Sequence, residues 1–101
     1  MPSLDQLLAL AAKSKKPLPW YGLAMEYRSL GRADEAVATF AKVHEIDPGY
    51  VPAYFMCAQV YAERGDVEQA RAELEAGLAR ARAAGDGHAE AEMRELLETL
   101  A

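Results

Sequence analysis

The sequence predicts an all-α protein built as an antiparallel array of helix-turn-helix hairpins. Glycine and proline fall at orderly breaks, and the stretches between them hold roughly 11 to 18 residues, the length of ordinary helices. These stretches are rich in Ala, Leu, Glu and Arg, which favour helix, whereas alternating β-branched runs are absent. The pattern of large and small side chains also repeats at a fixed spacing, which indicates stacked copies of one unit.

We expect helices over residues 3–13, 19–30, 33–46, 52–64, 66–84 and 87–100. In the first helix, Ser3 and Gln6 have the spacing of a capping box, in which each side chain accepts a hydrogen bond from the other residue's backbone N–H. The apolar stripe of this helix is Leu4, Leu7, Leu8 and Ala11. The second helix stops before Gly31, because glycine adopts the left-handed conformation that ends many helices.

The later helices carry similar signals. Asp34 and Glu35 lie favourably at the positive start of the third helix, and Pro48 ends it. The fourth stops before Gly65, and Asp66 is a good N-cap for the fifth. The apolar side of the last helix is Ala89, Met93, Leu96, Leu97 and Leu100. All connections are short, so consecutive helices should pack antiparallel.

Length and composition limit the classes of function. The chain has 101 residues with 51% hydrophobic and 27% charged side chains, as expected for one globular domain. Its net charge of -5 disfavours nucleic-acid binding, which needs a basic surface. No apolar run approaches the ~20 residues of a membrane span. Lys13 and its neighbours follow the first apolar stretch, the reverse of a signal peptide, so a cytoplasmic location is expected.

A shift of 34 residues superimposes two segments of the chain. The matched pairs are Trp20 with Tyr54, Leu23 with Cys57, Ala24 with Ala58, Tyr27 with Tyr61, Gly31 with Gly65, Ala36 with Ala70, Ala38 with Ala72, and Phe40 with Leu74. Small residues at matched positions let two helices approach closely, and large ones fill the layers between them. One hairpin cannot bury its apolar face alone, so the units should stack.

This pattern resembles the tetratricopeptide repeat, W-x2-L-G-x2-Y followed by A-x3-F and P. The resemblance divides the chain into a flanking helix at 1–16, repeats at 17–50 and 51–84, and a capping helix at 85–101, all within one domain. Arg82 stands where the second repeat would have its proline, so the fifth helix should run on to Gly85. A third repeat fails, because Glu92 and Glu95 fall at the small-residue and tyrosine positions.

The resemblance implies a concave face formed by the first helix of each repeat. Its groove residues would be Leu18, Tyr21, Met25, Arg28, Phe55, Gln59 and Ala62. Chaperone-adaptor members of the family hold a terminal carboxylate with Lys and Asn, at sites that Tyr21 and Met25 occupy here. A partner helix or an apolar peptide therefore fits better. Two alternatives stay open: the protein's own first or last helix covers this face, or a homodimer buries it.

The sequence contains little that indicates catalysis or metal binding. Cys57 occupies a core position without a basic neighbour, and as the only cysteine it cannot form an intrachain disulfide. His44 and His88 lie on different helices and are interpreted as structural or surface residues. The Gly-Asp-Gly at Gly85 lacks the strand and lysine of a phosphate loop. The glutamates of the last helix, Glu90, Glu92, Glu95 and Glu98, are interpreted as a solvated face.

We therefore predict a non-catalytic adaptor or assembly protein that needs no metal or cofactor. Its partner would be a protein or peptide, and neither a nucleic acid nor a membrane. The alternative is a self-assembling structural protein. The basic cluster at Lys13, Lys15 and Lys16 could then meet the acidic C-terminal end of another copy. An enzyme is the least favoured class.

Overall fold

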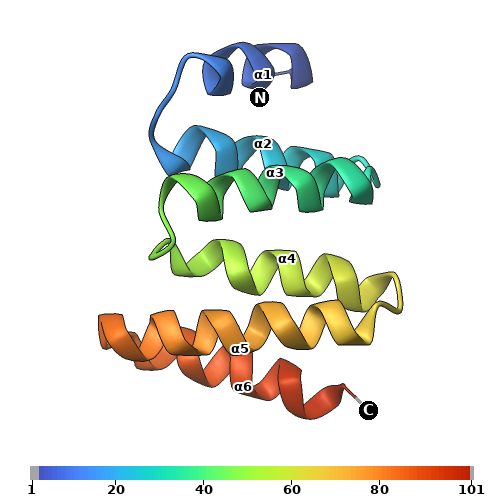
Figure 1. The fold of residues 1–101 in the computed structure, drawn as a ribbon. Helices are drawn as coiled ribbons and strands as arrows, with labels where there is room; N and C mark the ends of the chain where they lie inside the picture. Colours follow the sequence, from blue (N-terminus) through green and yellow to red (C-terminus); the bar gives the residue numbers. More distant parts are fainter. Residues whose placement is uncertain (1–2, 101) are drawn as a thin grey trace. The chain divides into compact units, whose positions relative to one another are not determined.

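The structure is a computed structural model that describes residues 3–100, within which the chain forms six α-helices and no strand. The helices are α1 (Leu4–Ala12), α2 (Pro17–Ser29), α3 (Ala33–Ile46), α4 (Val51–Glu63), α5 (Val67–Ala84) and α6 (Gly87–Thr99) (Figure 1). The all-α prediction is confirmed. None of these helices is both long enough and apolar enough to cross a bilayer.

Helix boundaries follow the sequence signals closely, with one larger difference at the start of α2. This helix begins at Pro17 instead of residue 19. Proline is tolerated there because the first backbone N–H groups of a helix have no partner within the helix. The capping box of α1 is confirmed: the Gln6 N–H donates to Ser3 Oγ over 3.2 Å, and the Ser3 N–H donates to Gln6 Oε1 over 2.8 Å.

The chain divides into two compact units, Met1–Pro48 and Gly49–Ala101. In the first unit, α2 and α3 form an antiparallel hairpin and α1 packs against α2 (Figure 1). In the second unit, α4 and α5 form the equivalent hairpin, and α6 packs against both of its helices. Each unit thus holds one of the two predicted repeats together with one flanking helix.

Both hairpins turn by the same hydrogen-bond pattern. Gly31 has a φ of 73°, in the left-handed region, and the Arg32 N–H donates back to the Tyr27 carbonyl over 2.9 Å. In the second hairpin Gly65 has a φ of 80°, and the N–H that follows it donates over 2.9 Å to the carbonyl of Tyr61. This is the Schellman motif, which satisfies carbonyls at the end of a helix and suits glycine because a Cβ would be strained there.

Four of the small residues that pair at a spacing of 34 are fully buried, whereas the matched pair Ala38 and Ala72 is exposed. Ala24, Ala36, Ala58 and Ala70 are each 0% exposed. Larger partners are buried equally well, since Leu23 and Cys57 are each 1% exposed. At these positions the two hairpins therefore have similar burial.

Trp20 and Tyr54 are matched in sequence but differ in environment. Trp20 is half-buried, its indole N–H donates to the Ser14 carbonyl over 3.1 Å, and Lys42 Nζ lies 5.5 Å from its ring centroid. Tyr54 is only 6% exposed, because it belongs to the core cluster that α6 completes. The additional helix thus gives the second hairpin a deeper core at this position.

The close contact among α4, α5 and α6 occurs at Gly77. A Cβ placed on Gly77 would lie 2.6 Å from Met93 Sδ and 2.6 Å from Tyr54 Cβ, distances that real Cβ atoms do not adopt. Met93 is 0% exposed, and the rest of the predicted α6 stripe packs around it: Ala89, Leu96, Leu97 and Leu100. The absence of a side chain at Gly77 therefore allows α6 to sit deeply on the α4–α5 hairpin.

α5 and α6 begin differently although an aspartate precedes each. The Asp86 carboxylate accepts a hydrogen bond from the Ala89 N–H over 3.0 Å and so caps α6. Asp66 occupies the N-cap position of α5, as predicted, but its side chain caps no backbone N–H. Its carboxylate lies instead 3.4 Å from Arg64 Nε. The predicted N-cap position of Asp66 is confirmed, although no side-chain hydrogen bond accompanies it.

We expect Gly77→Ala to destabilise the protein by about 1–3 kcal/mol, because Tyr54 Cβ is close to the α4 backbone and cannot move aside without it. The control is Gly22→Ala in α2, where an added Cβ meets nothing within 4 Å. That change should stabilise the protein by about 0.5–1 kcal/mol through helix propensity. Urea unfolding measures both, and equal effects would contradict the packing described here.

We expect Asp86→Ala to lower the free energy of unfolding by about 1 kcal/mol through loss of the α6 cap. Asp66→Ala should change it by less than about 0.5 kcal/mol, because it removes only an exposed ion pair. Thermal and urea unfolding of the two variants make the comparison. A larger loss for Asp66→Ala would show that the capping assignments are reversed.

Candidate functional site

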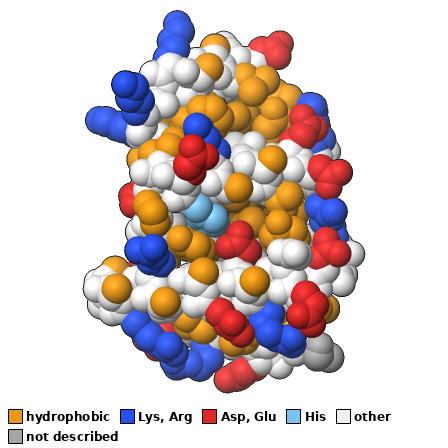
Figure 2. All heavy atoms as spheres, viewed as in Figure 1, with side chains coloured by type: hydrophobic (Ala, Val, Ile, Leu, Met, Phe, Trp, Pro, Cys, Tyr) orange, Lys and Arg blue, Asp and Glu red, His pale blue; other side chains and the backbone are white. Residues whose placement is uncertain are grey.

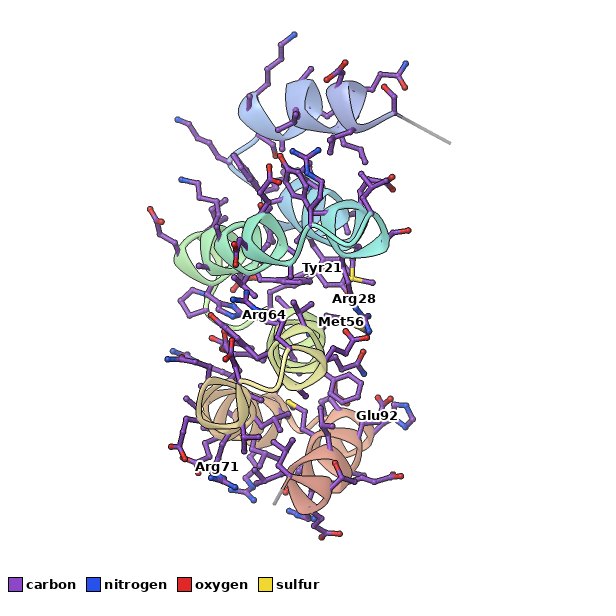
Figure 3. All side chains as sticks on the ribbon, turned by 90° about the vertical axis from the view of Figure 1, so that its right-hand side faces the viewer. Tyr21, Arg28, Met56, Arg64, Arg71 and Glu92 are labelled. Atoms are coloured by element: carbon purple, nitrogen blue, oxygen red, sulfur yellow. The ribbon has the colours of Figure 1, made fainter. Side chains whose placement is uncertain are left out.

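The predicted groove residues of the first unit are only partly buried. Leu18 is 64% exposed, whereas Tyr21, Met25 and Arg28 are half-buried on α2. Tyr21 and Arg28 are labelled in Figure 3. The Tyr21 ring meets Phe40 edge to face, with ring centroids 6.1 Å apart. Tyr21 therefore contributes to the packing of its own hairpin as well as to the surface.

The predicted residues of the second unit, Phe55, Gln59 and Ala62, are half-buried on α4. Phe55 packs against the core cluster to which Tyr54, Leu74 and Met93 belong. One side of its ring is thus supported by the hairpin and by α6. Its remaining surface borders the space between α4 and α6.

Two hollows in the second unit have Phe55 in common. The larger, about 310 Å³, is lined by Phe55, Glu92, Glu95, Leu96 and Thr99. The smaller, about 220 Å³, is lined by Val51, Pro52, Phe55, Met56, Asp86, His88, Ala89 and Glu92. We call the two together the Phe55 groove. Figure 3 shows Glu92 projecting from α6 on the side of α4, next to this groove.

Sequence reasoning missed the part of the Phe55 groove that α6 supplies. It interpreted Glu92 and Glu95 only as solvated residues that break a third repeat. A signal was available, because positions 89, 92, 96 and 99 recur at helical spacing and share one side of the helix. What the sequence did not indicate was that this side would border α4.

The carboxylates of α6 differ in whether a positively charged side chain pairs with them. Glu90 Oε2 accepts hydrogen bonds from Arg82 Nε over 2.9 Å and from Arg94 Nη2 over 2.6 Å. These hydrogen bonds hold the pKa of Glu90 below its usual range, and the bond from Arg82 has the larger effect. Glu92 lies 3.2 Å from His88 Nε2, a partner that is charged only when protonated. Among the described residues, Glu95 has no ion-pair partner. The acidic rim of the groove is therefore largely uncompensated.

The first unit carries exposed apolar side chains of its own. Leu8 on α1 is 39% exposed and Leu10 is 59% exposed, while Leu30, after the end of α2, is 51% exposed. Hydrophobic side chains gather between α1 and the α2–α3 hairpin in Figure 2. The predicted stripe of α1 is only partly correct, because Leu8 remains partly exposed and Ala11 is the residue of this helix that is fully buried.

Cys57 has the environment predicted for a structural thiol. It is 1% exposed, and burial raises the pKa of its thiol, as do the charge of Glu73 and a hydrogen bond with it. Burial also raises the pKa of Tyr61 on the same helix. Over residues 3–100, no group of three or more His, Cys, Asp or Glu side chains is placed to hold a metal ion.

Comparison with known proteins identifies the fold. The family model of the tetratricopeptide repeat matches residues 27–97, more than half of the chain. The chain therefore belongs to the tetratricopeptide repeat family, a group of modules that generally mediate protein–protein interaction. A curated relative, the tetratricopeptide repeat and J domain-containing co-chaperone DNJ1 of Cryptococcus neoformans var. grubii, is 37% identical over 57 residues. That match covers 56% of this chain and only 11% of the relative.

Solved structures agree with this assignment. A tetratricopeptide repeat domain protein from Salinibacter ruber has a TM-score of 0.79 at 26% identity and covers 84% of this chain and 86% of its own. A protein from Bordetella parapertussis reaches a TM-score of 0.84 at 27% identity, with coverage of 99% and 88%. PcrH, solved in complex with the chaperone binding region of PopD, has a TM-score of 0.89 at 20% identity, with coverage of 96% and 74%.

We expect Cys57 to react slowly with a thiol reagent in the folded protein and completely in denaturant, as measured by absorbance with an aromatic disulfide. The raised pKa also predicts a pH effect. The folded thiol keeps its proton where the unfolded thiol, with a pKa near ~8.5, loses it, so stability falls as pH rises above that value.

Between about pH 8.5 and 10, the wild type should lose about 1–2 kcal/mol more stability than Cys57→Ala, which has no thiol to titrate. Urea unfolding across this pH range measures the difference. If the stability of the two proteins changes with pH in the same way, or if the native thiol is labelled rapidly, the buried environment of Cys57 would be contradicted.

Proposed function

We propose that this chain is a non-catalytic adaptor that binds an apolar or amphipathic segment of another protein on the first helices of its repeats. Phe55 is the anchor in the second unit, and Leu18, Tyr21, Met25 and Arg28 form the corresponding surface in the first. Gln59 and Ala62 extend the surface along α4. The observation that carries the proposal is the Phe55 groove, in which a supported aromatic ring lies between two hollows.

The chemistry of Phe55 suits a binding anchor. An aromatic ring offers a large apolar surface with few rotatable bonds, so little conformational entropy is lost when a partner covers it. At protein interfaces a few well-packed residues, often aromatic, supply most of the binding energy. The complex of PcrH with the chaperone binding region of PopD supports the proposal, because that protein has the same fold and holds a segment of another protein.

Self-assembly is the second candidate function. It is favoured by the exposed leucines of the first unit, Leu8, Leu10, Leu18 and Leu30, which a second copy could cover. Sedimentation velocity over a wide range of protein concentration separates the two functions. An adaptor remains at the mass of one chain, whereas a self-assembling protein gains mass as its concentration rises.

We expect Phe55→Ala and Tyr21→Ala each to weaken partner binding at least tenfold, about 1.4 kcal/mol, because each removes an aromatic contact surface. Leu30→Ala is the matched control, since it removes an exposed apolar side chain outside the proposed surface. Partners would be captured from the native host with the wild type and identified by mass spectrometry. Their affinities for all variants would then be measured by titration calorimetry.

Each variant is also unfolded thermally, because Phe55 and Tyr21 have packing partners within their own units. Binding is compared only for protein that remains folded. If folded Phe55→Ala and Tyr21→Ala retain wild-type affinity, these residues serve packing alone and the proposed binding surface is wrong.

A further inference from the structure

We propose that the Phe55 groove selects a basic amphipathic segment, in which an apolar side chain packs on Phe55 and flanking Lys or Arg residues face the rim of α6. This inference rests on the proposed function, because it specifies the partner of the same surface. It adds a charge preference that the family fold alone does not supply.

The floor of the groove is apolar and is supplied by both helices. Val51, Pro52, Phe55 and Met56 come from α4, and Ala89 and Leu96 come from α6. Phe55 borders both hollows, so one apolar side chain of a partner can contact the ring in either of them. The combined volume suits a few side chains of a peptide and is too small to enclose a folded partner.

The permanent charges on the rim of the groove are all negative, and His88 adds a positive charge only when it is protonated. Its ionisable lining residues are Asp86, Glu92, Glu95 and His88, and within residues 3–100 no Lys or Arg lines either hollow. Asp86 already accepts the capping hydrogen bond of α6, so Glu92 and Glu95 are the carboxylates most available to a ligand. Both lie on α6 between Ala89 and Leu96, the two residues through which this helix contributes to the apolar floor.

The distribution of cations around the carboxylates of α6 strengthens this inference. The arginines that neutralise a carboxylate of this helix, Arg82 and Arg94, both pair with Glu90, which lines neither hollow. Glu92 and Glu95 are left facing an apolar hollow, where a partner would reduce their contact with water. A cationic partner offsets that cost, whereas an acidic or phosphorylated segment adds repulsion.

Exposed charges of this kind act mainly on selection and on the rate of association. Surface ion pairs are individually weak and are screened by salt. The apolar contact with Phe55 should therefore set most of the affinity, and the rim should decide which apolar segments bind. Affinity for a basic segment should fall as salt concentration rises.

A selection of random 12-residue peptides displayed on phage, carried out on the folded full chain, tests the inference. The wild type should enrich peptides that combine an aromatic or large aliphatic residue with two or more Lys or Arg. The pair Glu92→Gln and Glu95→Gln should lose the basic enrichment and keep the apolar one. The matched control pair, Glu75→Gln and Glu98→Gln, removes the same charge outside the groove and should behave as the wild type.

An enriched peptide would then be synthesised and titrated by fluorescence anisotropy. We expect the double groove variant to weaken its binding about tenfold at about 50 mM salt and less than threefold at about 500 mM, because salt screens the same charges. The control pair should change binding less than twofold at either concentration. Equal effects of the two pairs would overturn the inference, because the effect would then reflect net charge alone.

The outcomes separate this inference from the proposed function. Peptides that require Phe55 but show no excess of Lys or Arg would leave the proposed function standing and overturn the charge preference. Peptides that bind Phe55→Ala as well as the wild type would overturn both. If the purified chain self-associates and the groove pair abolishes that association, a second copy fills the groove and a separate basic partner is excluded.

Discussion

Close approach of three helices at Gly77 is the constraint on which the second unit depends. Tyr54 and Met93 reach the α5 backbone from α4 and α6, and neither could do so past a side chain at this position. The depth at which α6 packs decides how its outer residues face α4. Phe55 packs against the core cluster to which Tyr54 and Met93 belong, and the hollows beside it are lined by residues of α4 and α6.

α6 serves two purposes with two sides of one helix. Its apolar stripe completes the core of the hairpin, and the residues beside that stripe form one wall of the Phe55 groove. The failure of a third repeat has a physical meaning in this arrangement. Glutamate at a position where the family pattern has a small residue cannot enter a core, but it can supply charge at the edge of a groove.

The two units show how one repeat pattern supports different local environments. Both hairpins share buried alanines and the same glycine turn, so the same local features shape each of them. Their flanking helices differ: α1 buries Ala11 and leaves two leucines exposed, whereas α6 inserts Met93 and extends the core. Trp20 and Tyr54 consequently differ in burial despite their matched positions.

The helices, their turns and the repeat could be predicted from the amino-acid sequence, because those features depend on local propensity, on glycine at left-handed positions and on apolar spacing. Phe55 was also predicted as a surface residue from its place in the repeat. The tertiary structure was needed to show that Glu92 and Glu95 border the same hollow as Phe55, and that the side chain of Asp66, at the N-cap of α5, lies near Arg64 and bonds no backbone N–H. These outcomes depend on how deeply helices pack and on which partner lies nearest in space, and neither is encoded in the spacing of residues along one helix.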